Sequence, residues 1–220
     1  MLSKYSSIIF DCDGVVLNSN KLKSIAFYDT VKEFGENSAL QLYNYHIQNG
    51  GISRYAKFEY FVNEILEPPR NANVEMLLSK FSSIVSENLL KCEVLYGIED
   101  LRSGTNGANW SIVSGGDQAE LNTIFQNKGI HHFFNDGIFG SPATKYEIIR
   151  KQLAVGKYVG KTLFLGDSKL DFEVASYFGF DFVFISQWSE MENWEVFCED
   201  NNILSISSPI EILNVINFEK

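Results

Sequence analysis

The chain has 220 residues, of which 45% are hydrophobic and 21% are charged, close to the averages of soluble globular proteins. This composition excludes a disordered or collagen-like chain, and the length fits one sizeable domain or a core domain with a small insert. With 18 Lys and Arg against 28 Asp and Glu, the net charge is −10, which disfavours binding to nucleic acid or to an anionic membrane surface.

The first apolar cluster of the chain, residues 8–10, is interrupted at once by Asp11 and Asp13. It is too short for the core of a signal peptide, and no apolar run approaches the roughly 18 residues that span a bilayer. We therefore expect a cytoplasmic protein. The cysteines are widely spaced and form no CxxC pair, which predicts reduced thiols rather than a disulfide framework or a zinc site.

Short apolar runs alternate with helical patterns along much of the chain, which predicts an α/β protein with a parallel sheet. Each run is apolar throughout, as expected for a strand that is covered on both faces. The predicted strands are residues 6–10, 110–114, 137–140, 162–166 and 182–185.

The segment 16–92 breaks this alternation, because it contains no convincing strand pattern. Pro68 and Pro69 divide it and end the third of its helices. We therefore expect a helical domain at 16–92, inserted into an α/β core domain of residues 1–15 and 93–220. Apolar residues at helical spacing predict its four helices, in the stretches 22–31, 39–47, 52–65 and 74–89.

Capping residues mark the helices of the core. Asp117 is expected to cap a helix that ends at Gly129, with Glu120 completing a capping box. Two later helices are expected, from Ser141 to about Gly156 and from Ser168 to Gly179.

Two carboxylates, Asp11 and Asp13, come directly after the first predicted strand. In an open α/β sheet the carboxyl ends of the strands are where ligands bind, and strand alternation would point both side chains to the same side. Such close negative charges repel one another unless a proton or a cation holds them, and Mg²⁺ prefers oxygen ligands. The alternative is a simple turn at Asp13 and Gly14.

A second acidic pair, Asp167 and Asp171, follows the strand predicted at 162–166. Asp171 would lie about one turn into the next helix, facing the strand end. Taken alone, this stretch is better explained by helix capping through Asp167 or Ser168. Together with the first pair it places four carboxylates at two strand ends, and such a cluster needs a metal.

Two further features suit a phosphate group. Ser114, Gly115 and Gly116 end a strand and precede a helix, where exposed amides and a helix N-terminus can bind an anion. Lys145 lies early in a helix, a position that is unfavourable for a cation unless it meets an anion. The alternatives are a plain strand–turn–helix joint and a solvated surface lysine.

In this order and context, these residues resemble the four sequence motifs of the haloacid dehalogenase-like (HAD) superfamily, and the resemblance covers nearly the whole chain. It implies a Rossmann-like parallel sheet. The helical insert resembles the C1 cap domain of the phosphoglycolate phosphatase and β-phosphoglucomutase branch. The matching motifs are Asp11-x-Asp13, Ser114, Lys145 and Gly166-Asp167-Ser168-x-x-Asp171.

The resemblance implies catalytic and phosphate-binding roles for several residues. Asp11 would be the nucleophile that forms an aspartyl-phosphate, and Asp13 would be the general acid and base. Ser114 and the amide of Gly115 would bind phosphoryl oxygens, while Lys145 would neutralise the charge of the phosphate and of Asp11.

The resemblance also implies a bound Mg²⁺. Asp11 and Asp167 would bind it with their carboxylates, and Asp13 would take part through its main-chain carbonyl. Asp171 would be a direct ligand or a partner of the ligands.

Asp13 separates classes within the superfamily, because dehalogenases and phosphonatase-like members lack an acid there. The resemblance therefore implies a Mg²⁺-dependent phosphatase that acts on a small phosphomonoester, with a sugar phosphate as one candidate. A sugar phosphomutase and a non-catalytic interaction protein of the same fold are the alternatives. The oligomeric state is open, and a monomer is compatible with the sequence.

The stretch from Asn49 to Arg54 resembles the substrate-specificity loop of C1 caps. Arg54 is a candidate anchor for a carboxylate or hydroxyl of the leaving group, and Asn49 is a second candidate. The alternative is that Ser53 caps a helix and Arg54 lies on the surface. A cap that closes over the site implies a small substrate.

Overall fold

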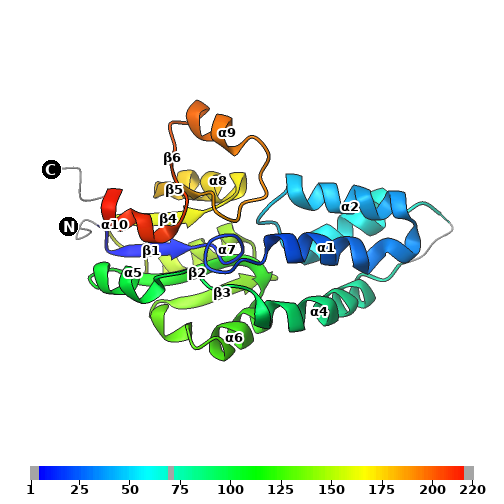
Figure 1. The fold of residues 1–220 in the computed structure, drawn as a ribbon, viewed down its shortest axis with the longest axis horizontal. Coiled ribbons are helices and arrows are strands. Elements are labelled where there is room, and N and C mark those ends of the chain that lie inside the picture. Colours follow the sequence, from blue (N-terminus) through cyan, green and yellow to red (C-terminus); the bar gives the residue numbers. More distant parts are fainter. Residues whose placement is uncertain (1–4, 69–71, 216–220) are drawn as a thin grey trace.

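The computed structural model describes residues 5–68 and 72–215. In this part of the chain one sheet runs in the order β3-β2-β1-β4-β5-β6, and every neighbouring pair is parallel (Figure 1). The predicted α/β fold with a parallel sheet is confirmed. The strands are β1 (Ser7–Phe10), β2 (Asn109–Asp117), β3 (Gly137–Ser141), β4 (Thr162–Gly166), β5 (Asp181–Ile185) and β6 (Leu204–Ile206).

Two details of the sheet differ from the sequence prediction. β2 continues past residue 114 to Asp117, where it pairs with Ser141 after a shift in register, as at a β-bulge. The glycines in this stretch disguise the continuation, because glycine disfavours strands. β6 is missed because it is three residues long and only Ile206 among them is buried.

The four helices expected in the insert are present, and among the described residues the core has three helices beyond the expected ones, at Ile98–Gly104, Trp194–Asp200 and Ile212–Val215. The insert contains α1 (Asn20–Val31), α2 (Glu36–Gln48), α3 (Arg54–Tyr60) and α4 (Val74–Lys91). A 3₁₀ turn (Lys32–Phe34) follows α1, and a π-helical turn (Phe61–Ile65) extends α3. The core contains α5 (Ile98–Gly104), α6 (Gln118–Asn127), α7 (Lys145–Ala154), α8 (Lys169–Phe178), α9 (Trp194–Asp200) and α10 (Ile212–Val215), with 3₁₀ turns at His131–Phe133 and Pro209–Glu211.

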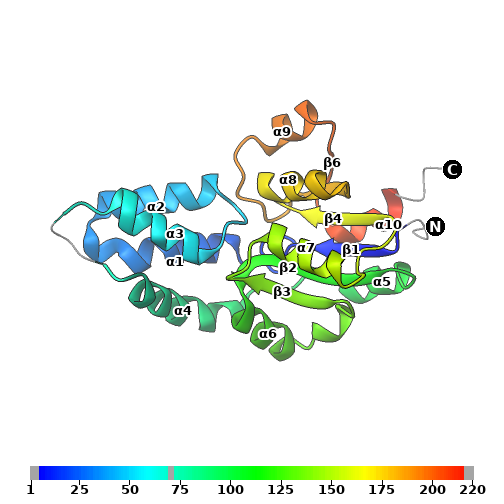
Figure 2. The same cartoon turned by 180° about the vertical axis from the view of Figure 1, so that it is seen from behind.

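The four helices of the insert lie beyond the end of the sheet toward which the strands point (Figures 1 and 2). α5 also falls between β1 and β2 in the chain, but it lies at the opposite end of the sheet. We call α1–α4 the cap. The division at residues 15/16 and 92/93 stays a prediction. Pro68 stands in the turn after α3, as expected, whereas Pro69 lies outside the described residues.

Successive residues of β1 face opposite sides of the sheet, which explains its continuous apolar run. Ile8 and Phe10 pack in one hydrophobic cluster with α5 and α6, whereas Ile9 packs in a second cluster with α7 and α8. All three side chains are at most 1% exposed. The strand is thus fixed from both faces, and its carboxyl end is held in a defined position beside the cap.

The cap is built around an aromatic cluster of its own. Phe27 of α1 and Phe81 of α4 have ring centroids 4.4 Å apart, and Phe58 of α3 lies 5.6 Å from Phe81. All three rings are buried. No helix in residues 5–68 and 72–215 has the length and apolar character needed to cross a bilayer.

Of the helix starts predicted for the core, one is confirmed at Asp117, and two details are wrong. Asp117 caps α6 by accepting from the amides of Ala119 and Glu120, both at 3.0 Å. The predicted capping box is wrong, because the Glu120 carboxylate turns toward the cap instead. The predicted helix start at Ser141 is also wrong, since Ser141 is the last residue of β3.

The two later helices of the core have clear caps at their starts. α7 begins at Lys145, where Thr144 and Glu147 form a capping box. Ser168 caps α8 as predicted by accepting from the amide of Asp171 at 3.3 Å. The lysine at the start of α7 and the aspartate in the first turn of α8 are therefore held by well-defined helix termini.

Candidate active site

Asp11 is the first residue after β1, and its carboxylate is buried at the carboxyl end of the sheet. Its amide donates to the carbonyl of Leu165 on β4 at 2.9 Å. Its Oδ1 accepts from the amide of Cys12 at 2.7 Å. Its Oδ2 lies 3.0 Å from Lys145 Nζ. The neighbouring strands β1 and β4 thus fix the backbone of Asp11, while the Cys12 amide and Lys145 fix the direction of its side chain.

Asp11, Asp167 and Asp171 form a buried cluster in which one carboxylate oxygen from each lies within 4.8 Å of the others. Parallel strands end at the same edge of a sheet, so the ends of β1 and β4 meet here. Lys145 Nζ also lies 2.5 Å from Asp171 Oδ1, and Ser168 donates to Asp171 Oδ2 at 2.6 Å. The structure therefore brings together acids that are far apart in the sequence.

The cluster carries more negative than positive charge. Burial raises the pKa of Asp11 to about 7, although Lys145 opposes this shift. Burial, with Asp11 and Asp171 nearby, also raises the pKa of Asp167 well above its usual range. Burial alone would lower the pKa of Lys145, but the two carboxylates raise it.

Three buried carboxylates and one ammonium need a further positive charge or a proton. Because the atoms of the cluster that could bind a metal are all carboxylate oxygens, which are hard ligands, the residues fit a divalent cation such as Mg²⁺.

The carboxylate of Asp13 faces a different set of partners. Its oxygens lie 2.7 Å from Lys23 Nζ and accept from Ser19 Oγ at 2.5 Å. Burial would raise the pKa of Asp13, but Lys23 and Ser19 lower it. The metal-binding cluster found among the described residues does not include Asp13. Asp13 is thus held as a carboxylate next to the cluster, at the boundary with the cap.

The chain also makes a tight turn at Asp13 and Gly14, so the simpler interpretation of the first motif holds as well. The amides of Val16 and Leu17 both donate to the carbonyl of Cys12. Gly14 has φ +77°, and a Cβ there would overlap the carboxylate of Asp167. A glycine is therefore required for the turn to pass beside the acidic cluster.

Ser114 is buried at the bulged part of β2, and its hydroxyl accepts from the amide of Gly116 at 2.9 Å. Gly115 touches the cap, because a Cβ there would overlap the carbonyl oxygen of Gly51. The predicted phosphate-binding roles of Ser114 and Gly115 stay predictions. In the structure, Gly115 and Gly116 line the cavity described below.

The sequence pattern of the haloacid dehalogenase-like hydrolases matches residues 8–185, which include every acid of the cluster. The chain belongs to this family. No curated protein matches the chain in a sequence search. The family membership confirms the resemblance predicted from the motifs.

Solved structures of HAD proteins share the fold over almost the entire chain. A haloacid dehalogenase-like hydrolase from Streptococcus pneumoniae is 21% identical with a TM-score of 0.70, over 98% of this chain and 100% of that one. A predicted phosphoglycolate phosphatase from Haemophilus somnus is 18% identical with a TM-score of 0.73, over 97% and 98%. CbbY from Rhodobacter sphaeroides, solved in complex with phosphate, is 15% identical with a TM-score of 0.69, over 94% and 96%.

In this HAD hydrolase, side chains at the start of α3 join the cap to the start of α6 in the core. Arg54 of α3 donates to both carboxylate oxygens of Glu120 on α6, at 2.5 and 3.0 Å. Tyr55 donates to Asp117 at 2.8 Å. The surface position considered for Arg54 is wrong, since only 5% of it is exposed, whereas Ser53 does cap α3.

The cap loop that contains Asn49 and Gly51 lies directly over the acidic cluster. A Cβ at Gly51 would stand 3.2 Å from Ser168 Oγ and 3.4 Å from Lys145 Nζ. Asn49 and Arg54 both line the cavity beneath the loop. Their roles in substrate recognition stay predictions, and the structure adds that Arg54 already has an acidic partner.

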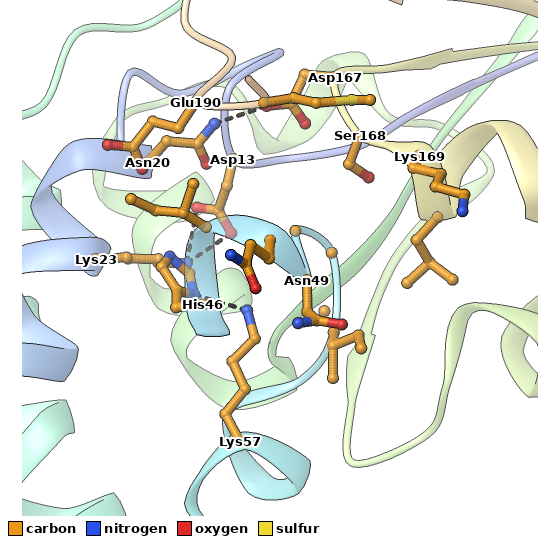
Figure 3. A pocket seen from close by; sticks show the side chains of 18 of the residues that line it. Asp13, Asn20, Lys23, His46, Asn49, Lys57, Asp167, Ser168, Lys169 and Glu190 are labelled. Atoms are coloured by element: carbon orange, nitrogen blue, oxygen red, sulfur yellow. Dashed lines mark hydrogen bonds and ion pairs between the residues drawn. The ribbon is translucent and has the colours of Figure 1, made fainter. Parts of the chain in front are cut away.

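A cavity of about 490 Å³ lies between the cap and the core (Figure 3). Asn20 links its two sides by donating to Asp167 Oδ2 at 2.6 Å and to the carbonyl of Trp188 at 2.9 Å. Several lining residues were not identified from the sequence. They are Asn20, Lys23, His46, Lys57 and Glu190.

The missed cavity residues left a weak signal in the sequence. Lys23 and Phe27 are one helical turn apart on the buried face of α1, and Lys57 directly precedes the buried Phe58 on α3. A lysine on an apolar helix face is a departure from amphipathic patterning. Such a lysine commonly extends its ammonium group to water, so the signal does not by itself identify a site.

Proposed function

We propose that this HAD hydrolase is a Mg²⁺-dependent phosphatase that hydrolyses a small phosphomonoester through an aspartyl-phosphate on Asp11. The observation that carries the proposal is the buried cluster of Asp11, Asp167 and Asp171 with Lys145 at its centre. A cavity of about 490 Å³ under a cap supports a small substrate over a polymer. The phosphatase name and the bound phosphate of two fold neighbours agree with this chemistry.

In the first half of the proposed reaction, a carboxylate oxygen of Asp11 attacks phosphorus while the bond from phosphorus to the ester oxygen breaks. The amide of Cys12 and the ammonium of Lys145 orient the attacking group. Lys145 also offsets the negative charge that the phosphate adds to the site. The leaving alkoxide takes a proton from Asp13.

Asp13 is charged in the free enzyme, because Lys23 and Ser19 lower its pKa. The arrival of a negatively charged phosphate raises that pKa, so Asp13 takes up a proton from solvent as the substrate binds and holds it for the leaving group. In the second half, the Asp13 carboxylate takes a proton from water as the water attacks the aspartyl-phosphate. Inorganic phosphate then leaves, and the Asp11 carboxylate is restored.

Asp11 and Asp167 would hold the metal ion, with Asp171 as a further ligand or as a partner of the ligands. When bound, Mg²⁺ would supply positive charge for the phosphoryl oxygens. Asn20 and Ser168 fix two of these acids, since Asn20 donates to Asp167 and Ser168 donates to Asp171. These bonds leave the carboxylates oriented before any ligand arrives.

The proposal is tested by release of inorganic phosphate from a panel of sugar and acid phosphates in the presence of Mg²⁺. Asp11→Asn should lose at least about a thousandfold in kcat, while its circular dichroism spectrum stays that of the wild type. Asp29→Asn is a matched control, because Asp29 pairs with Lys32 on the outside of the cap. Phosphate transfer to an isomer without release would instead identify a phosphomutase, and no turnover above Asp11→Asn would refute the enzyme assignment.

A further inference from the structure

Apart from the exposed Lys169 of α8, the acids and cations that line the cavity come from opposite sides of it. The acids come from the core, at the ends of β1 and β4 and from the loop after β5, which carries Glu190. The buried cations on the opposite side come from cap helices, with Lys23 on α1 and Arg54 and Lys57 on α3. A ligand that spans the cavity therefore meets negative groups at the metal-binding end and positive groups at the cap end.

Two of these cap cations already have an acidic partner. Lys23 pairs with Asp13 at 2.7 Å, and Arg54 pairs with Glu120 at 2.5 Å. Their charge is therefore largely used within the protein, the first to hold the acid–base residue and the second to join the cap to the core. Neither is left as a strong site for an added anion.

Lys57 differs from them, since no carboxylate within residues 5–68 and 72–215 lies within 4.0 Å of its ammonium. The contact of Lys57 Nζ is His46 Nδ1, at 2.6 Å (Figure 3). Only 1% of Lys57 is exposed, and its ammonium lies 5.4 Å from the ring centre of Phe27. The lysine is thus buried in the cap beside an aromatic ring, yet its end belongs to the lining of the cavity.

His46 cannot supply the missing negative charge. Its ring accepts from the ammonium of Lys57, and its pKa lies well below the usual range because of burial and of Lys57 and Lys23. Burial likewise lowers the pKa of Lys57 to about 7, only partly opposed by Asp13. An anion placed beside this pair would restore the charge of Lys57 and gain an ion pair with a buried ammonium.

We propose that Lys57, with His46 behind it, binds a second anionic group of the substrate. The substrate class is then a small phosphomonoester whose leaving group ends in a carboxylate or in another phosphate. This inference rests on the proposed phosphatase function for the phosphate at the other end of the cavity. It adds a binding site on the cap that is separate from Asp11 and its cluster.

The test compares three esters of similar length with the Mg²⁺-loaded enzyme. Glycerol 3-phosphate has a neutral end, 3-phosphoglycerate ends in a carboxylate, and propane-1,3-diyl bisphosphate ends in a phosphate. We expect kcat/KM for at least one of the two esters with a charged end to exceed that of glycerol 3-phosphate, whose other end is neutral, by tenfold or more. The charged ester that is preferred tells whether the site takes a carboxylate or a phosphate.

Lys57→Met should reduce this preference at least tenfold, with Lys57→Gln as a second variant if the first folds poorly. Lys80→Met is the matched control, because it removes a cap lysine that pairs with Glu33 at the surface. The preference should survive in that control. Equal kcat/KM for charged and neutral esters, or a preference that Lys57→Met does not change, would overturn the proposal.

A binding measurement separates failure of this site from failure of the phosphatase assignment. In Asp11→Asn, which cannot form the aspartyl-phosphate, calorimetry with 3-phosphoglycerate and glycerol 3-phosphate reports affinity without turnover. Tighter binding of the charged ester, lost when Lys57→Met is added, supports the anion site even if no ester is hydrolysed. Hydrolysis of all three esters without such a difference would leave the phosphatase standing and remove the anion site.

Discussion

Arg54 of the cap and Glu120 of the core form a buried ion pair with two hydrogen bonds, 2.5 and 3.0 Å long. The same guanidinium lies 4.7 Å from the ring centre of Phe81 and donates to Ser82 on α4. Since α3, α4 and α6 meet at this pair, it joins the cap to the core beside the acidic cluster.

Loss of this pair should weaken the fold and lower kcat. In Arg54→Ala the carboxylate of Glu120 stays buried without its partner, which costs about 3 kcal/mol of unfolding free energy. Lys23 lies 3.9 Å from Glu120, so we also expect it to be drawn away from Asp13 and kcat to fall.

The Arg54→Ala prediction is checked by urea unfolding and by steady-state kinetics, with Glu120→Gln and the double variant completing a mutant cycle. An Arg54 that instead anchors the substrate would alter specificity between esters far more than it alters stability. Additive losses in the cycle would show that the ion pair does not couple the two helices.

Removal of the metal should abolish turnover and lower stability together. A cation that binds the folded state alone raises the melting temperature as its concentration increases. We expect EDTA to stop phosphate release, added Mg²⁺ to restore it, and Mg²⁺ to raise Tm by several degrees. Asp167→Asn should lose this Tm shift, whereas Asp29→Asn should keep it. Indifference of the wild-type Tm and activity to both reagents would remove the metal from the proposal.

The preference for charged over neutral esters should depend on pH. Lys57 binds an anion in its protonated form, and its pKa in the free protein is about 7. The ratio of kcat/KM for 3-phosphoglycerate, whose carboxylate is charged throughout, and glycerol 3-phosphate should therefore be constant below about pH 6 and fall above pH 7, by up to about tenfold per pH unit. The groups that act on Lys57 are His46, Asp13, Lys23, Lys145 and Glu190.

Taking the ratio of two esters cancels the titration of groups that both reactions share, including Asp11 and Asp13. Kinetics from pH 5.5 to 9 with Lys57→Met measure what remains. A ratio in the wild type that stays level across this range would show that Lys57 does not recognise the second anion.

Lys57→Met should also make the protein more stable. The pKa of Lys57 is about 7 in the folded protein, whereas its ordinary value, taken for the unfolded chain, is 10.5. Between these two pH values the unfolded chain therefore binds more protons than the folded protein. Wild-type stability therefore rises with pH across this window, and the penalty is complete below about pH 7. A pKa shift of this size lowers the free energy of unfolding of the wild type by roughly 5 kcal/mol. Lys57→Met removes this penalty, but it also loses the hydrogen bond to His46, which offsets part of the gain.

We expect Lys57→Met to gain at least about 1 kcal/mol at pH 7, with the gain shrinking toward pH 10. Urea unfolding at several pH values measures it, with Lys80→Met as the exposed control. A variant less stable than the wild type at pH 7 would mean that Lys57 has a stabilising role in the cap instead.

Local patterns in the sequence were sufficient to predict most of the fold. Residues 162–166 form β4 with the predicted bounds, and the cap helices follow the predicted apolar spacing. The meeting of Asp11 with Asp167 and Asp171 was also predictable, because acids at the ends of parallel strands share one edge of the sheet. These features depend on side-chain periodicity and on the ends of elements, which neighbouring residues encode.

The tertiary structure alone decided which long side chains face the cavity and which charges pair. Glu120 stands where a capping box would use it, but the docked cap brings Arg54 within reach, and the charged pair forms instead. Lys57 resembles an ordinary helix-surface lysine until Phe27 of α1 and His46 of α2 pack against it. Pairing and burial depend on how helices far apart in the chain pack together, within the cap and between cap and core, and no local pattern carries that information.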